Sequence, residues 1–330
     1  MAAGITVSVV CLYFATRGVD WADVRRILAG ARPGWLGAVV VASIATVYIR
    51  AQRWRVLLRP LGEVPLYPAL SATAIGFGAS AVLPFRLGEL LRPALLGRRA
   101  GVGMSAALSS VVLERLFDLL LVIGCFLAVA LAYPIPIALQ RSAFGLAAFA
   151  GAGLAVLVAM QRNPTLARAL VGLVLDRLPA DLSRRLGRLG EAFLGGLGAL
   201  SDLPTVALVL WYSAYLWGVI TLTFLFSFLA LGTQVPLVAA SLTTVVIVAA
   251  AVFLPQAPGF IGPWQAGCVL ALTLFGVSRE AAVSYSWLTW IVQMLVNVGT
   301  AGVFLVREDL SLGQLVRVAE GDTPVAGPQG

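Results

Sequence analysis

Histidine and lysine are both absent from this sequence, and charged residues make up only 12% of its 330 positions. A soluble domain has about 25% charged residues, so the composition argues against a soluble protein. The absence of histidine excludes His-based acid–base chemistry, Ser–His dyads and His-ligated metal sites. The three cysteines, Cys11, Cys125 and Cys268, lie far apart within apolar stretches, and their spacing indicates neither a metal site nor a disulfide framework.

Apolar residues dominate what is present. Hydrophobic residues account for 60% of the chain, and the mean hydropathy is +0.96. All 23 basic residues are arginine, and the net charge is +8. This charge suits cytoplasmic loops and anionic lipid headgroups. Planar guanidinium groups suit bidentate phosphate binding, although a GC-rich genome that encodes arginine in place of lysine explains the same count. The basic residues are dispersed, so nucleic acid is not an expected partner.

Apolar runs of roughly 17–25 residues are long enough to cross a bilayer. They predict an all-α polytopic membrane protein with about six full spans plus two re-entrant helical hairpins, eight hydrophobic segments in total. The spans are expected at residues 2–16, 34–49, 104–133, 142–160, 205–229 and 281–306, and the hairpins at 67–96 and 236–275. We expect a single integral membrane domain over residues 1–309 and a polar, disordered tail over 310–330.

Two proline- and glycine-broken stretches interrupt the apolar sequence. They are LPFRLGELLR at residues 83–92 and LPQAPGFIGPWQAG at residues 254–267. Broken backbone at membrane depth is tolerated only where protein or a water-filled cavity satisfies the freed amides and carbonyls. A matching pair of breaks in two halves points to a transport site. The residues expected to form these structural breaks are Pro84, Gly88, Pro255, Pro258, Gly259 and Gly262.

The two breaks predict an inverted repeat with units at residues 34–133 and 205–306. Aligning the units pairs Pro84 with Pro255 and Gly88 with Gly259, although chance similarity between apolar segments is the alternative. Between the units, residues 162–203 combine arginines with helically spaced apolar residues, which predicts a cytoplasmic amphipathic connector. The arginine bias places both termini in the cytoplasm of a multi-pass plasma (inner) membrane protein.

Three charged residues lie within the first broken stretch at spacings of three, Arg86, Glu89 and Arg92. In a helix they share one broad face, where two guanidinium groups around a carboxylate suit an anionic headgroup. The alternative is a hairpin tip at the membrane surface whose charges are solvated.

A second charged group, Glu114, Arg115 and Asp118, lies inside the expected span 104–133. Glu114 and Asp118 are four residues apart and share a helix face. Ionisable groups within a span are costly and usually face a partner or a cavity. The two carboxylates therefore predict either an arginine partner or proton coupling, unless this part of the helix is shallow and interfacial.

The second half offers uncharged counterparts in Gln265, Gln293 and Asn297. Buried amides usually join helices to each other; alternatively, these line a cavity and bind sugar or glycerol hydroxyls. Arg53, with Trp54 and Arg55, ends the second predicted span. This cluster is typical of a membrane anchor with positive-inside charge, and its alternative role is to gather anionic lipid.

Together these motifs resemble the lysylphosphatidylglycerol synthase transmembrane-region family, also called the flippase-like membrane domain. The resemblance rests on RAQRWRVLLRPLG, GFGASAVLPFRLGELLRPALL, ALSSVVLERLFDLL and LPQAPGFIGPWQAG, and it extends over residues 18–306. It implies a stand-alone member without the aminoacyl-transferase domain of bifunctional members, linked to lipid translocation. The chain departs from the family at Ala81–Val82, where an Asn often precedes Leu-Pro.

We therefore predict a lipid flippase-like transporter that translocates an anionic phospholipid or polyprenyl-phosphate lipid across the plasma membrane. Its partners are membrane lipids, a homo-oligomer is compatible with the sequence, and no cofactor, metal or enzymatic activity is expected. One alternative is an integral membrane enzyme acting on a lipid phosphate or lipid-linked sugar, with Mg²⁺ at Glu89, Glu114 and Asp118. Another is a non-catalytic accessory subunit.

Overall fold

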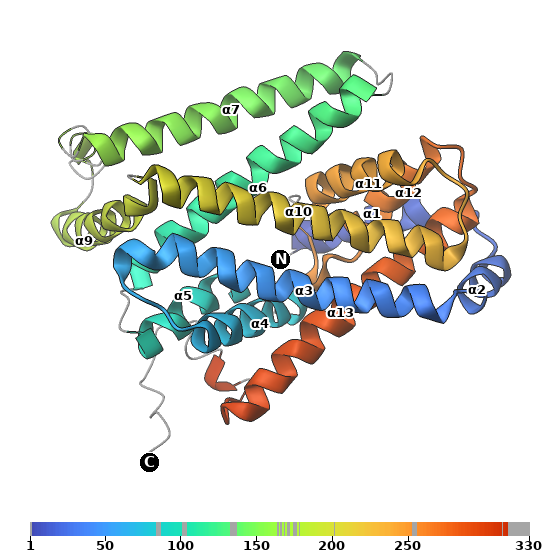
Figure 1. The fold of residues 1–330 in the computed structure, drawn as a ribbon, viewed down its shortest axis with the longest axis horizontal. Helices are drawn as coiled ribbons and strands as arrows, with labels where there is room; N and C mark the ends of the chain where they lie inside the picture. The colour runs from blue at the N-terminus through green and yellow to red at the C-terminus, as the bar shows by residue number, and fades with distance from the viewer. Residues whose placement is uncertain are drawn as a thin grey trace.

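The computed structural model describes residues 2–83, 87–100, 104–132, 137–163, 179–200, 202–252, 256–311 and 313–315, with a few positions between 165 and 177. This part of the chain is helical and contains no strand (Figure 1). Its elements are α1 (Ala2–Thr16), α2 (Trp21–Ala29), α3 (Pro33–Leu58), η1 (Arg59–Leu61), α4 (Leu66–Val82), α5 (Leu87–Ala100), α6 (Met104–Ala132), α7 (Ile137–Arg162), α9 (Ala180–Gly196), η3 (Leu197–Leu200), α10 (Leu203–Leu231), α11 (Leu237–Val252), η4 (Pro258–Phe260), α12 (Pro263–Thr273) and α13 (Arg279–Arg307).

Several of these helices are suited to a bilayer. Three segments are long and apolar enough to cross one, Pro33–Leu61, Leu203–Leu231 and Arg279–Arg307, and shorter apolar helices accompany them. Large apolar side chains face outward on all three, as Val41, Trp211 and Leu295, each 68% exposed, illustrate. Lipid favours such a surface, whereas water does not. The all-α class is confirmed; the number of spans and the re-entrant insertion stay predictions.

The two central helices, α3 and α10, lie side by side along most of their length and run in opposite directions (Figure 1). Arg32, just before α3, donates its backbone N–H to the Ala230 carbonyl near the end of α10, 2.8 Å away. At the other end, η1 after α3 contacts η3 before α10.

The helices around this pair pack reciprocally. Each predicted hairpin is formed by two contacting helices, α4 with α5 and α11 with α12. Helix α4 also packs against α13, and its counterpart α11 packs against α6. Contacts of α3 with α4 and α6 are matched by contacts of α10 with α11 and α13.

Close contacts in the first hairpin depend on glycine. A Cβ atom at Gly88 would lie 1.9 Å from the Gly76 carbonyl oxygen, and a Cβ at Gly78 would lie 2.2 Å from the Ala301 Cβ. Small residues let membrane helices approach this closely. Gly88 was expected to break the backbone. It instead lies in the first turn of α5, where its role is close packing against α4.

Helix boundaries follow ordinary capping rules, especially in the second half. Asp202 accepts a hydrogen bond from the Thr205 N–H at the start of α10, and Gly232 ends that helix with φ +66°. Ser278 caps α13 by accepting from the Ala281 N–H. Side-chain oxygens satisfy free amides at N-termini, and glycine adopts the left-handed conformation at C-termini.

The first half departs from the prediction in one helix. The second span was expected to end at residue 49 before a solvated arginine cluster. Helix α3 instead continues to Leu58, because three apolar residues follow the cluster and become buried.

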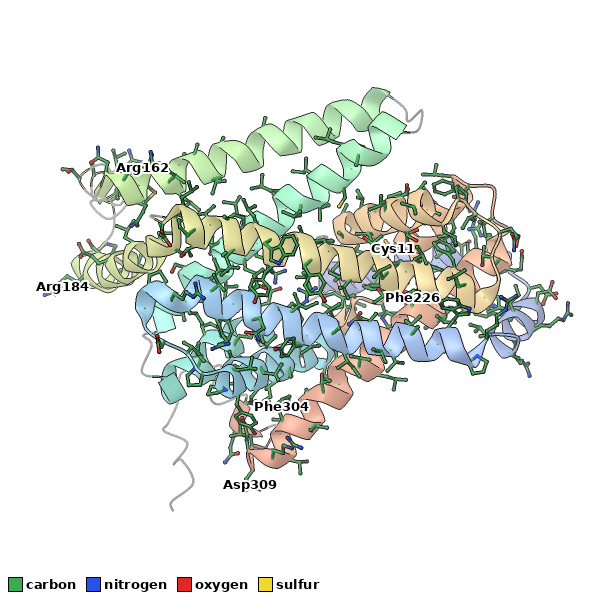
Figure 2. All side chains as sticks on the ribbon, viewed as in Figure 1. Cys11, Arg162, Arg184, Phe226, Phe304 and Asp309 are labelled. Atoms are coloured by element: carbon green, nitrogen blue, oxygen red, sulfur yellow. The ribbon has the colours of Figure 1, made fainter. Side chains whose placement is uncertain are left out.

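Two arginines of the predicted connector lie at one end of the molecule. Arg162 ends α7, Arg184 lies on α9, and Figure 2 shows both at the same end. The tail expected over 310–330 begins with ordered residues, since Leu310 and the 2%-exposed Leu315 pack against the cluster formed by α4 and α5. This apolar packing attaches Leu310 and Leu315 to the folded helices.

Candidate functional site

A cavity of about 200 Å³ lies where the two halves meet. Helices α3, α4, α5 and α6 contribute lining residues from the first half, and α10, α11, η4, α12 and α13 contribute them from the second. Its volume falls below the roughly 300–1,000 Å³ of pockets that enclose drug-sized ligands. The cavity therefore suits a small polar headgroup better than a whole lipid.

Each long helix presents one face to this cavity. On α3 the lining residues Val39, Ser43, Thr46 and Arg50 recur every three or four positions, which is the spacing of one helical face. Thr289, Gln293 and Asn297 repeat the pattern every four residues on α13. The helical period thus places one basic side chain of α3 and two amide side chains of α13 at the cavity.

A buried group of ionic side chains adjoins the cavity, centred on Glu114 of α6. Arg92 binds both Glu114 carboxylate oxygens at 3.1 Å, in a bidentate arrangement. Arg53 and Arg115 each place a nitrogen 3.2 Å from Glu114 Oε1. Glu114 is 0% exposed, Arg53 0% and Arg92 1%. Such buried charges persist only when paired.

Asp118, one turn further along α6, is the second carboxylate of this group. Arg53 donates to its Oδ1 at 2.6 Å and to its Oδ2 at 3.2 Å, and the Trp217 indole N–H donates to Oδ1 at 3.1 Å. Arg115 lies 3.8 Å from Oδ2. Asp118 therefore joins α3, α6 and α10 through charge-assisted hydrogen bonds.

Two of the guanidinium groups lie over aromatic rings. Arg92 Cζ lies 4.5 Å from the Trp54 ring centroid and 5.3 Å from that of Phe77, and Arg50 Cζ lies 4.6 Å from the Phe77 centroid. Trp54 is itself fixed by a 2.8 Å hydrogen bond to the Ser110 hydroxyl. Cation–π contacts stabilise a cation without using its N–H donors.

The second break is a shaped turn that touches the first hairpin. Gly259 has φ +73°, and a Cβ atom there would lie 3.3 Å from the Ala81 carbonyl oxygen near the end of α4. Its own carbonyl accepts from the Trp290 indole at 2.6 Å. Gly262 has φ +93° and leaves no room for a Cβ beside Ser8 of α1. Pro258 begins η4 within the same turn.

Of the predicted substrate-binding residues, five line the cavity: Glu89, Arg115, Asp118, Gln293 and Asn297. Arg92 and Glu114 belong to the adjoining ionic group. Gln265 does not line the cavity; it is fully buried, and its side-chain oxygen accepts from the Gly262 N–H to cap α12. Arg86, with the predicted break residues Pro84 and Pro255, lies outside the described residues.

Two functional candidates were missed as site residues, Arg50 and Arg53. Arg53 belongs to the cluster that was assigned to the membrane surface, Arg50 precedes it by three residues, and both lie on the inner side of α3. The signal for their burial is the apolar run Val56–Leu57–Leu58 directly after them, because a solvated helix end is rarely followed by another apolar turn.

The proposed Mg²⁺ ligands do not come together as a metal site. The carboxylates of Glu114 and Asp118 accept from arginines, and the part of the chain with described coordinates contains no group of three acidic or cysteine side chains placed to hold one ion. The donor set fits ion pairing rather than the several oxygen ligands of Mg²⁺.

Comparison with known proteins agrees with the resemblance seen in the sequence. Residues 1–299 match the family model described as Lysylphosphatidylglycerol synthase TM region. The chain is also similar to Glycosyltransferase AglD of Haloferax volcanii, with 29% identity over 123 residues. That match covers 37% of this chain and spans 20% of the relative's length.

Proposed function

The chain belongs to the lysylphosphatidylglycerol synthase transmembrane-region family, and from this premise we propose that it translocates an anionic phospholipid or a polyprenyl-phosphate lipid across the plasma membrane. The observation that carries the proposal is the cavity between the two halves, which is lined by arginines and carboxylates from α3, α5 and α6 and by amides from α13. A headgroup occupies the cavity while its acyl or prenyl chains remain in the membrane.

The reciprocal packing of the halves supports an inverted repeat with two re-entrant hairpins. Helices α3 and α10 run in opposite directions, and the contact of α4 with α13 mirrors that of α11 with α6. Inverted repeats commonly place a substrate site at the interface of their units near the bilayer midplane. Contact between Ala81 and Gly259 places the end of α4 against the second break.

The amides supply the uncharged part of the recognition. Gln293 donates to the Asn297 side-chain oxygen at 3.0 Å, which leaves the Gln293 oxygen and the Asn297 nitrogen facing a polar ligand. One acceptor and one donor on adjacent turns suit glycerol or sugar hydroxyls.

The proposal can be tested with purified protein in vesicles. The vesicles contain phosphatidylcholine with about 10 mol% phosphatidylglycerol, which gives them a negative surface charge. Fluorescent phosphatidylglycerol is bleached from outside by dithionite, and parallel vesicles carry a labelled polyprenyl phosphate. We expect bleaching of the inner-leaflet label to accelerate only in protein-containing vesicles. Rates equal to those of protein-free vesicles for both lipids would rule out translocation as the activity.

A second candidate, a membrane step on a lipid-linked sugar, is favoured by the partial match to a glycosyltransferase. Chemical change of a lipid-linked sugar in the same vesicles, detected by chromatography, supports this reading over transport.

A further inference from the structure

We propose that Arg50 is the residue that binds the phosphoryl oxygens of the headgroup, while Arg53 and Arg92 mainly hold helices together. This inference rests on the proposed function and assigns a role to Arg50, a residue that belongs to the motif RAQRWRVLLRPLG but to which neither the motif nor the comparisons give a function.

Arg50 differs from its neighbours in its partners. It lines the cavity, and its guanidinium group stacks 4.6 Å from the Phe77 ring centroid. It makes no ion pair with any carboxylate that the structure describes. A stacked guanidinium group keeps its N–H donors in the plane of the group, where they are available to a ligand.

The terminal nitrogens of Arg53 and Arg92 already bind carboxylates within the protein. Arg53 contacts Asp118, Glu114 and the Ser213 hydroxyl, the last at 3.1 Å. Arg92 forms the bidentate pair with Glu114. Neither residue lines the cavity, so a headgroup there would have to break a buried ion pair to reach them, which is costly.

The charged side chains around the cavity carry an excess of positive charge, which an anion can balance. Four arginines, at positions 50, 53, 92 and 115, face three carboxylates, at 89, 114 and 118, in the described part of this region. One positive charge therefore lacks a matching carboxylate, and Arg50 is the arginine with no ion-pair partner among them. An unmatched charge at membrane depth is costly, and a phosphoryl group supplies the missing negative charge.

Arg115 of α6 reaches the same cavity from a different helix. Its side chain is 29% exposed, more than those of Arg53 and Arg92, and it lies 3.2 Å from Glu114 and 3.8 Å from Asp118. Arg50 and Arg115 both line the cavity. A phosphoryl group bound by Arg50 therefore also lies within the field of the most exposed arginine of that group.

Binding can be measured separately from transport, because Trp217 and Trp264 line the cavity and report on it by fluorescence. The full chain in detergent is titrated with the short-chain lipid dihexanoylphosphatidylglycerol and, in a second arm, with inorganic phosphate. We compare the wild type with R50Q, R50K and R26Q. Arg26 is the matched control, since its side chain is 78% exposed on α2.

We expect R50Q to weaken lipid binding by about tenfold or more, because a charge-assisted hydrogen bond is worth roughly that factor. R50K keeps the positive charge but lacks the planar guanidinium group, so we expect it to bind the lipid several-fold more weakly than the wild type. If R50Q does not fold, R50K tests the assignment in its place. R26Q should bind as the wild type does. If inorganic phosphate alone saturates the site in an Arg50-dependent way, Arg50 is still the phosphate-binding residue and the ligand is free phosphate.

Wild-type affinity in both R50Q and R50K would overturn the assignment. That result leaves the proposed function standing if the wild type still translocates lipid in vesicles. Conversely, Arg50-dependent binding without translocation contradicts the proposed function alone.

Discussion

Replacing Glu114 by glutamine should strongly destabilise the protein, because this carboxylate is shared by three arginines. Arg92 is 1% exposed, and Glu114 is its carboxylate partner among the described residues. The substitution leaves that guanidinium group buried without a counter-charge. Removing one member of a buried ion pair typically costs about 3–5 kcal/mol. Glutamine keeps one acceptor oxygen, so we expect about 3 kcal/mol or more.

An exposed pair on α2 provides the control for this prediction. Asp23 and Arg26 lie 2.9 Å apart with side chains 42% and 78% exposed, and the loss of such a surface pair costs about 0–1 kcal/mol. The free energy of unfolding of E114Q and D23N is measured by SDS titration in mixed micelles, followed by tryptophan fluorescence. If the two variants lose the same stability to within about 1 kcal/mol, the buried ionic group does not hold α3, α5 and α6 together.

Three further predictions concern other parts of the site. Gly88→Ala should reduce the yield of folded protein in size-exclusion chromatography because its Cβ meets the α4 backbone, whereas Gly299→Ala, which meets nothing within 4 Å, should not; equal yields would contradict the close contact. Asn297→Leu should slow translocation of phosphatidylglycerol by about tenfold, the factor for one lost hydrogen bond of about 1.4 kcal/mol, with little loss of stability, and an unchanged rate would remove the amide from the site. Ser8→Ala removes the acceptor of the Ala257 N–H at 2.8 Å, so hydrogen exchange at the second break should become faster, and unchanged exchange would show that α1 does not restrain it.

Most helix positions could be predicted because hydropathy and capping residues specify them locally. Expected spans at 205–229 and 281–306 correspond to α10 and α13, which begin at the capping residues Asp202 and Ser278. Only part of the ionic group could be predicted from the sequence in the same way. The spacing of Glu114 and Asp118 predicts either an arginine partner or proton coupling, and the structure places Arg92 and Arg53 against these carboxylates.

The identity of the second partner could not be predicted, because Arg53 and Asp118 are 65 residues apart. The apolar run after the basic cluster indicates that its arginines are buried, but it does not identify the carboxylate that each buried arginine contacts. Gln265 shows a related difficulty: an amide that caps its own helix cannot be distinguished by sequence from one that faces a ligand.

A cryo-electron microscopy map of the protein in nanodiscs containing phosphatidylglycerol is the most direct test of the account. We predict density for a phosphate group inside the cavity, between Arg50 and Asn297, continuous with lipid chains that leave between the helices. A map that resolves the surrounding annular lipids but holds no headgroup in this cavity would contradict the central claim.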